Sequence, residues 1–201
     1  MINYSNIEVV SRRKKRLTIE RDFPDALILD VTSKAESPWI KFSPFYPHGG
    51  IPVPYAAEVF AESVEGVWQG LKVFDNHGVD QTKFNVTGMK GIKRTCRKYG
   101  NVLGHKKGVN SSELIPYIEA RYEIYLPCYH FVLKNYLVNE IQFLRDKVND
   151  GSKLVLLDYE TNCDISDPSR PLSHAALIRS YISDNWPTKP TKKLSGTSII
   201  R

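Results

Sequence analysis

Hydrophobic and polar positions along the chain predict two buried strands. Residues 25–33, DALILDVTS, are dense in apolar and β-branched side chains over a short run after a proline, which is typical of a buried strand. Residues 154–157 are apolar throughout and polar residues begin at Asp158, which predicts a second buried strand. Near the start, IEVVSR and RLTIER are short alternating runs on either side of the basic stretch RRKKR, and we expect them to pair as an N-terminal β-hairpin.

Longer periodic segments predict helices. One helix is expected from about residue 62 to 74, with Ser63 as its cap and DNHG as its stop. Residues 111–148 predict two helices, or one helix kinked at Pro127, because proline lacks the N–H that a helical turn needs. RPLSHAALIRSYI predicts a short closing helix. Strands, a loop, several helices, a strand and a helix in this order predict a helix-rich α+β single domain with a small β-sheet over residues 1–186, followed by a flexible basic tail at 187–201.

A loop over residues 37–55, rich in proline and aromatic residues, separates the first buried strand from the first helix. Aromatic side chains are costly to leave in water, so we expect the loop to pack, and long loops in compact domains are usually functional or disordered. The pair Gly49 and Gly50 would let backbone N–H groups approach a ligand closely. We expect the loop to form a pocket wall; the alternative is a proline-stiffened connector.

The helix expected at 62–74 has an unusual polar face. Successive helical residues turn by about 100°, so Glu65, Gln69 and Lys72 fall within one narrow face. The alternative is a solvated stripe, but apolar neighbours leave little room for an exposed side: Val64, Val67, Trp68 and Leu71. Gly66 and Gly70 lower the helix propensity by up to about 1 kcal/mol each relative to alanine, and we expect another segment to approach the helix closely there.

The composition is that of an ordinary soluble protein with an excess of positive charge. A formal charge of +6 and a pI near 9.1 favour an anionic partner, either a nucleic acid or a phosphorylated small molecule. Much of the excess lies in RRKKR, in residues 90–107 and in the tail lysines Lys189, Lys192 and Lys193, and solvated turns and ends are the alternative interpretation.

Several site classes are not indicated. The three cysteines form no CxxC pair and the five histidines show no metal spacing, so we expect free thiols, no metal site and no cofactor. P-loop, dinucleotide and nucleophile-elbow motifs are missing from the sequence. No run approaches the ~18 apolar residues of a membrane span, and we expect a cytoplasmic protein without membrane contact.

FSPF at 42–45, followed by SVEGVWQGLKVF at 63–74, resembles the NADAR (YbiA-like) family of N-glycosidases. The residues that match the family's pattern in type and order are Phe42, Ser43, Phe45, Glu65, Gln69, Lys72 and Phe74. Phe74 lies one residue further from Glu65 than is typical. The family's glycine-rich acidic loop is replaced by CDISDPSRP, and a tryptophan before its middle helix has only Tyr117 or Tyr122 as a stand-in. The chain would be a divergent member.

The resemblance implies a hydrolase that cleaves a ribose C1′–N bond, in an ADP-ribosylated base or nucleic acid or in a phosphorylated ribosylamino nucleotide derivative. Glu65 would stabilise the positive charge that develops on the sugar and act as base toward water. Asp164 would be the complementary carboxylate, with Asp158 or Asp167 as alternatives. The expected substrate-binding residues are Phe42, Ser43, Phe45, His48, Gly49, Gln69, Lys72, Lys93, Arg94, Tyr159 and Asn162.

Two other functions fit the same residues. One is a noncatalytic module that binds a nucleotide or nucleic acid in the same pocket, and the other is a structural protein with a solvated polar stripe. Glu65→Gln separates the first from the hydrolase, because a binder keeps its affinity whereas a hydrolase loses turnover with its fold intact. The structural protein predicts that Glu65→Ala is nearly silent.

Overall fold

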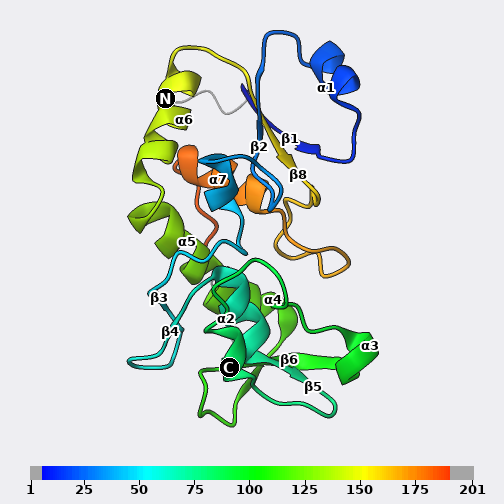
Figure 1. Ribbon diagram of the computed structural model, residues 1–201, viewed down its shortest axis with the longest axis vertical. Helices are drawn as coiled ribbons and strands as arrows, with labels where there is room; N and C mark the ends of the chain where they lie inside the picture. Colours follow the sequence, from blue (N-terminus) through cyan, green and yellow to red (C-terminus); the bar gives the residue numbers. More distant parts are fainter. Residues whose placement is uncertain (1–5, 191–201) are drawn as a thin grey trace, which may run out of the picture.

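A parallel three-stranded sheet organises one end of the molecule (Figure 1). In the computed structural model, which describes residues 6–190, β8 (Leu154–Asp158) lies between β1 (Ile7–Ser11) and β2 (Leu27–Asp30) and runs parallel to both. Every residue of β8 is buried, as expected for a near-continuous apolar run covered on both faces. Both buried strands predicted from the sequence are confirmed.

The two faces of β8 serve different clusters because side chains alternate along a strand. Leu154 and Leu156 belong to the main core, whereas Val155 and Leu157 pack with Ile19 on the opposite face. Asp158 continues the series of even-numbered positions. Its side chain is thereby placed on the side of the main core, at the carboxyl end of the strand.

The predicted N-terminal β-hairpin is wrong. RLTIER does not return as a strand but forms α1 (Arg16–Asp22), which packs Ile19 against the sheet. β1 pairs with β8 instead, in parallel, from Ile7 opposite Leu154 to Ser11 opposite Asp158. The apolar run Leu154–Leu157 gives β1 a buried central strand as its partner, which the charged run RLTIER could not offer.

The other end of the molecule is built around α2 (Val64–Leu71) and a small antiparallel sheet (Figure 1). The strands of this sheet are β5 (Lys72–Phe74), β6 (Val102–Lys106) and β7 (Leu114–Ile115). A short strand pair, β3 (Ile51–Pro52) with β4 (Phe60–Ala61), lies before α2. Short helical segments complete this part: a 3-10 turn at Gln81–Lys83 and α3 (Cys96–Tyr99). A further 3-10 turn, Trp39–Phe42, lies next to β2.

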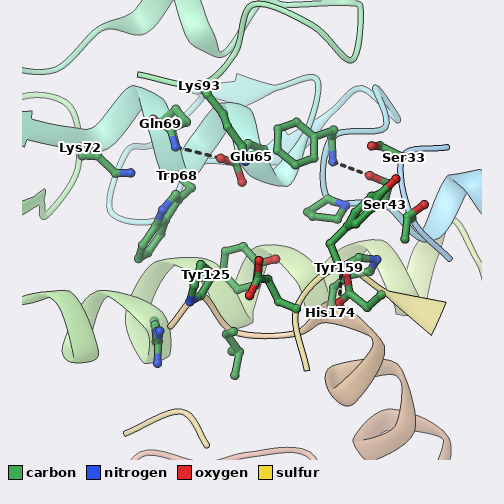
Figure 2. A pocket seen from close by; sticks show the side chains of 18 of the residues that line it. Ser33, Ser43, Glu65, Trp68, Gln69, Lys72, Lys93, Tyr125, Tyr159 and His174 are labelled. Carbon is green, nitrogen blue, oxygen red and sulfur yellow. Dashed lines mark hydrogen bonds and ion pairs between the residues drawn. The ribbon is translucent and has the colours of Figure 1, made fainter. Parts of the chain in front are cut away.

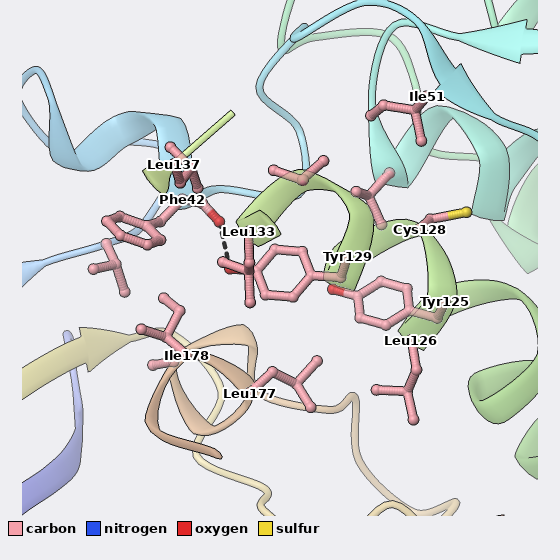
Figure 3. Close-up of a cluster of buried hydrophobic side chains, with 14 of the residues drawn as sticks. Phe42, Ile51, Tyr125, Leu126, Cys128, Tyr129, Leu133, Leu137, Leu177 and Ile178 are labelled. Atoms are coloured by element: carbon pink, nitrogen blue, oxygen red, sulfur yellow. Dashed lines mark hydrogen bonds between the residues drawn. The ribbon is translucent and has the colours of Figure 1, made fainter. Parts of the chain in front are cut away.

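A run of helices forms the core between the two ends. Residues 117–149 fold into α4 (Tyr117–Ala120), a π-helical turn (Arg121–Tyr125), α5 (Leu126–Asn135) and α6 (Val138–Asn149). α7 (His174–Ile182) is the predicted closing helix. Figure 3 shows Tyr129 of α5 at the centre of this core, where its hydroxyl donates a hydrogen bond of 2.7 Å to the Phe42 carbonyl oxygen.

These elements form one α+β domain, about 36% helix and 17% strand, which confirms the predicted fold class. No helix in residues 6–190 is both long enough and apolar enough to cross a bilayer. Most of the predicted basic tail, residues 191–201, lies outside the described residues. Within the described part of that tail, Lys189 pairs with Glu123 of the π-helical turn.

Candidate functional site

A cavity of about 500 Å³ lies where the carboxyl ends of the parallel strands meet α2 (Figure 2). All three strands contribute to it: Arg13 follows β1, Thr32 and Ser33 follow β2, and Asp158–Glu160 end β8. Ligands bind at the carboxyl ends of strands in many open parallel sheets. The opposite wall comes from α2, from the loop at 43–45 and from residues 93–94.

The α2 wall is fixed by close packing on the glycine face of the helix. The Ser63 hydroxyl accepts a 3.0 Å hydrogen bond from the Gly66 N–H, which confirms the predicted cap. A Cβ on Gly66 would lie 2.7 Å from the Lys83 carbonyl oxygen, and one on Gly70 would lie 2.2 Å from the Phe84 ring. The close approach expected at these glycines is thus confirmed.

The helix is shorter than predicted. It ends at Leu71, and Lys72 is already extended, with ψ 134°, as the first residue of β5. The helical-face argument therefore holds for Glu65 and Gln69 only. Lys72 reaches the same cavity from a strand.

Glu65 is the buried carboxylate of this wall, with 8% of its surface exposed. The Gln69 amide donates a 2.8 Å hydrogen bond to Glu65 Oε1, drawn as a dashed line in Figure 2. The backbone N–H of Arg94 donates to Gln69 Oε1, which fixes the amide so that its NH₂ group faces Glu65. Burial raises the pKa of Glu65, although the Gln69 hydrogen bond and the charges of Lys72 and Lys93 act in the opposite direction.

Two lysines bring positive charge next to Glu65. Lys72 lies 5.8 Å from the Trp68 ring and Lys93 lies 5.3 Å from the Phe45 ring, in cation–π arrangements. Burial lowers the pKa of Lys72, while the neighbouring Glu65 charge raises it. Within residues 6–190 neither ammonium group makes an ion pair or a hydrogen bond, so both remain available to an anionic ligand.

Arg94 lines the cavity but has a different task from the predicted one. Its guanidinium donates to the carbonyl oxygens of Gln69, Lys72 and Gly78, at 2.7–3.1 Å. These carbonyls lie at and just beyond the end of α2, where helices leave unpaired acceptors. Arg94 therefore caps α2 and orients Gln69, and this structural role takes the place of the substrate-binding role expected from the sequence.

The π-helical turn supplies groups that sequence reasoning missed. Arg121 and Tyr125 of this turn line the cavity, and π-helical turns are frequent at functional sites. Tyr117 of the preceding α4, which the sequence suggested only as a stand-in for the family's tryptophan, lines it as well. The buried Arg121 guanidinium donates to the carbonyl oxygens of Ile165, Asp167 and Arg170, which holds the loop at 163–171 beside the cavity. The only sequence signal was a single arginine within a tyrosine-rich helical segment.

Trp68 of α2 packs against three other aromatic rings. Its ring lies 3.8 Å from that of His105 and 5.7 Å from those of Tyr117 and Tyr125, measured between centroids. Burial raises the pKa of Tyr125 well above its usual range, and the charges of Glu65 and Asp158 raise it further. A flat ring therefore has stacking partners in the cavity, and Tyr125 is electrostatically coupled to both carboxylates.

Asp158 is the carboxylate of the sheet wall. Its Oδ2 accepts hydrogen bonds from the Ser173 hydroxyl at 2.8 Å and from the Ala175 N–H at 3.3 Å, and lies 2.9 Å from His174 Nδ1. Burial alone would raise its pKa, but the His174 charge and these hydrogen bonds lower the pKa of Asp158 to about 2. Asp158 is thus an ionised group at neutral pH.

The first basic stretch reaches the mouth of the cavity. Arg13 donates a 2.5 Å hydrogen bond to the Tyr159 carbonyl oxygen, lies 5.4 Å from the Tyr159 ring and pairs with Glu160 at 3.7 Å. Neither Arg13 nor Ser33 was predicted as a site residue. The RRKKR stretch was a signal for charge, but the expected hairpin placed it at a distant turn.

The cavity brings together most of the predicted site. The predicted residues that line it are Ser43, Phe45, Glu65, Gln69, Lys72, Lys93, Arg94, Asp158 and Tyr159. The loop is anchored to α2 by a 2.8 Å hydrogen bond from the Glu65 N–H to the Pro44 carbonyl oxygen. The pocket wall expected from residues 37–55 is therefore confirmed at residues 43–45.

Three predicted residues of this loop do not line the cavity. Phe42 is fully buried in the main core, where its apolar ring stacks on that of Trp39. The His48 ring stacks on Tyr136, and its Nε2 lies 2.9 Å from the Lys41 carbonyl oxygen. Gly49 donates its N–H to the Glu62 carbonyl oxygen rather than to a ligand space.

Two predicted residues of the later loop are also outside the cavity. Asp164 is exposed and accepts hydrogen bonds from the Ser166 N–H and hydroxyl, which lower its pKa. The buried Asn162 amide donates to the carbonyl oxygens of Asp167 and Arg170, at 3.4 and 3.2 Å, and so shapes the loop. Asp158, the alternative carboxylate, lines the cavity where Asp164 does not.

A family model described as Family of unknown function (DUF6939) matches residues 11–178. The chain belongs to the DUF6939 family. Searches of curated proteins and of solved structures find no match. All cavity residues from Arg13 to His174 lie within the part of the chain that defines DUF6939 membership. The resemblance to the NADAR family stays a prediction.

The groups in the cavity can perform proton transfer and charge stabilisation. They comprise a buried carboxylate with a raised pKa, an ionised carboxylate, two unpaired ammonium groups and several aromatic rings. Within residues 6–190, no three His, Cys, Asp or Glu side chains come close enough together to hold a metal ion.

Proposed function

We propose that the protein is an N-glycosidase that hydrolyses a ribose C1′–N bond in a phosphorylated, nucleotide-like substrate. The substrate would be an ADP-ribosylated base or nucleic acid, or a phosphorylated ribosylamino nucleotide derivative. The observation that carries the proposal is the buried Glu65 in a cavity with a second carboxylate, aromatic rings and unpaired lysines. The resemblance of residues 42–45 and 63–74 to the NADAR pattern supports it.

Glu65 would act on water. Burial raises the pKa of Glu65, and a carboxylate with a raised pKa is a stronger base in its ionised form than an ordinary carboxylate. The C1′–N bond breaks with its electron pair going to nitrogen, and positive charge develops on the sugar beside Glu65. A water molecule bonds to C1′ and its proton passes to Glu65, while the leaving nitrogen takes up a proton from solvent; Glu65 then returns its proton to solvent.

The other cavity groups have complementary tasks. Trp68 and Tyr125 would flank the leaving base, and Lys72 and Lys93 would neutralise phosphate charge. Both lysines are near enough to Glu65 to influence its pKa, so the anionic part of the ligand would lie near the reacting carbon. The volume of about 500 Å³ lies in the range of small-molecule sites.

The test is product release by the full-length protein. Candidate substrates are an oligonucleotide with an ADP-ribosylated guanine and a ribosylaminopyrimidine phosphate, with released products identified by mass spectrometry. We expect Glu65→Gln to reduce turnover by about 10²-fold or more, since general-base catalysis contributes that much. Its matched control is Glu62→Gln, the same chemical change at a residue that does not line the cavity. Absence of release from every candidate would refute the catalytic proposal.

A noncatalytic binding module is the second candidate. It is favoured by the surroundings of Asp158. Three donors face its Oδ2 and keep it ionised, so the cavity offers Glu65 no second carboxylate for proton transfer. A binder predicts that Glu65→Gln retains the affinity for adenosine 5′-diphosphate ribose, as measured by calorimetry, and that the wild type releases no product from any of the candidate substrates.

A further inference from the structure

His174 is a further buried titratable residue at the cavity, and the proposed reaction does not use it. The residue begins α7, directly after Ser173, and 8% of its surface is exposed. Its Nε2 lies 2.8 Å from the Val31 carbonyl oxygen and its Nδ1 lies 2.9 Å from Asp158 Oδ2. Figure 2 shows its ring on the sheet side of the cavity, opposite α2.

The hydrogen-bond partners define the protonation of this ring. A carbonyl oxygen only accepts, so Nε2 must carry a hydrogen, and an ionised carboxylate also only accepts, so Nδ1 must carry one too. The ring is then a cationic imidazolium that bridges β2 and β8. The groups that face it are Asp158 from β8, Asp30 from β2 and the Tyr129 ring from α5. Burial lowers the pKa of His174, but the charge and hydrogen bond of Asp158 outweigh burial and raise it.

Within residues 6–190, all hydrogen bonds to the Asp158 carboxylate fall on one of its two oxygens. Oδ2 accepts from Ser173 and Ala175 and faces His174, whereas Oδ1 receives none from the residues that the structure describes. Asp158 lines the cavity, so Oδ1 is the acceptor left for a ligand. A carboxylate oxygen held in this way is matched to a donor such as a sugar hydroxyl group.

We propose that His174 is a positioning residue for Asp158: the imidazolium anchors Oδ2 and thereby presents Oδ1 to a hydroxyl group of the ligand's ribose. Asp158 is then a sugar-binding group and not the proton donor of the reaction. This inference rests on the proposed function for the identity of the sugar, but its test uses binding alone.

Two isosteric variants separate the two contacts of the ring. In His174→Asn the amide nitrogen takes the place of Nδ1 and still donates to Asp158, whereas in His174→Gln it takes the place of Nε2 and donates to Val31. Both variants remove the charge and are similar in size. A role in stability alone predicts the same behaviour for both.

The probes are adenosine 5′-monophosphate and its 2′,3′-dideoxy analogue, titrated by calorimetry into the full-length protein. We expect His174→Gln to weaken binding of the ribose probe about tenfold or more, as a hydrogen bond to a charged group is lost, and His174→Asn to stay within about threefold of the wild type. The dideoxy probe should bind all three proteins equally. Equal affinities of wild type and His174→Gln for the ribose probe overturn the inference, as does a wild type that does not distinguish the two probes.

A spectroscopic measurement keeps the proposal testable if a variant does not fold. In ¹⁵N-histidine-labelled wild type, both ring nitrogens of His174, assigned through the contact with Tyr129, should be protonated near pH 7. A neutral His174 ring overturns the inference. If His174→Gln weakens ribose binding as expected but no product is released, only the hydrolase proposal is refuted. If product is released but His174→Gln binds the ribose probe as the wild type does, only the role of His174 is refuted.

Discussion

The cavity has two walls that each carry a carboxylate, and the two carboxylates behave in opposite ways. On the α2 wall, Glu65 accepts a hydrogen bond from a single neutral amide, and burial raises its pKa. On the sheet wall, Asp158 is equally buried, yet three donors, one of them cationic, lower its pKa to about 2. Burial sets the same cost for both, and the number and charge of the donors decide which form each group adopts.

This difference assigns separate tasks to the two walls. A carboxyl group whose pKa is raised binds and releases a proton closer to neutral pH than an ordinary carboxyl group does, whereas a strongly ionised group serves as a fixed acceptor or a charge. The α2 wall therefore suits proton transfer and the sheet wall suits ligand positioning.

Removing the sheet-wall carboxylate should have the largest effect on stability. Asp158→Ala leaves the buried His174 ring, the Ser173 hydroxyl and the Ala175 N–H without their acceptor. Breaking a buried ion pair from one side costs about 3–5 kcal/mol. We expect the free energy of unfolding in urea to fall by that amount. Asp164→Asn, an exposed residue outside the cavity, is the control and should cost less than about 1 kcal/mol. Similar losses for the two variants would contradict a structural ion pair at the sheet wall.

The α2 wall should instead be sensitive to added volume. Gly70→Ala would place a Cβ 2.2 Å from the buried Phe84 ring, and overpacking typically costs about 1–3 kcal/mol despite the gain in helix propensity. The matched control is Gly78→Ala, where nothing lies within 4 Å, and it should change the unfolding free energy by about 0.5 kcal/mol or less. A neutral Gly70→Ala would show that this helix face is not closely packed.

The two walls also differ in how far the sequence predicts them. The α2 wall comes from one contiguous stretch whose cap, glycine contacts and polar pair follow from local rules, and all three are confirmed. The error at Lys72 arose because a strand that directly continues a helix leaves no break in the apolar pattern. The sequence predicts this wall because the hydrogen-bond partners lie within one or two turns of the same helix, and because the glycines mark where another segment packs against it.

The sheet wall depends on pairings that a hydrophobic pattern does not encode. The apolar run at 154–157 identifies a strand but not its partners, so parallel pairing with β1 and β2 was not foreseen, and with it the positions of Arg13 and Ser33. His48 and His174 illustrate the same limit. Both are isolated histidines without a metal-binding spacing, and only the tertiary fold brings one of them to a carboxylate and keeps the other away.

The smallest expected effect is also the sharpest contrast between the walls. Because the folded-state pKa of Glu65 is raised, the folded protein binds this proton more tightly than the unfolded chain does. Its contribution to stability is therefore fully present below the unfolded pKa of about 4.3 and is lost as pH rises through the folded pKa. Glu65→Gln removes that loss, and we expect its unfolding free energy to exceed that of the wild type at pH 7 by about 0.5–2 kcal/mol, as is common when a strained functional group is replaced.

For Asp158 the sign is reversed. Its folded pKa of about 2 lies below the unfolded value of about 3.9, so its contribution is present above the unfolded pKa and is lost as pH falls through about 2. Urea unfolding of the wild type, Glu65→Gln and Asp158→Asn should be measured from acid to neutral pH. The difference in unfolding free energy between Glu65→Gln and the wild type should grow as pH rises, and that between Asp158→Asn and the wild type should shrink as pH falls. Glu62→Gln should follow the wild type within about 0.5 kcal/mol. Parallel curves for the two cavity variants would mean that both carboxylates share one environment, and the separation of tasks between the walls would fail.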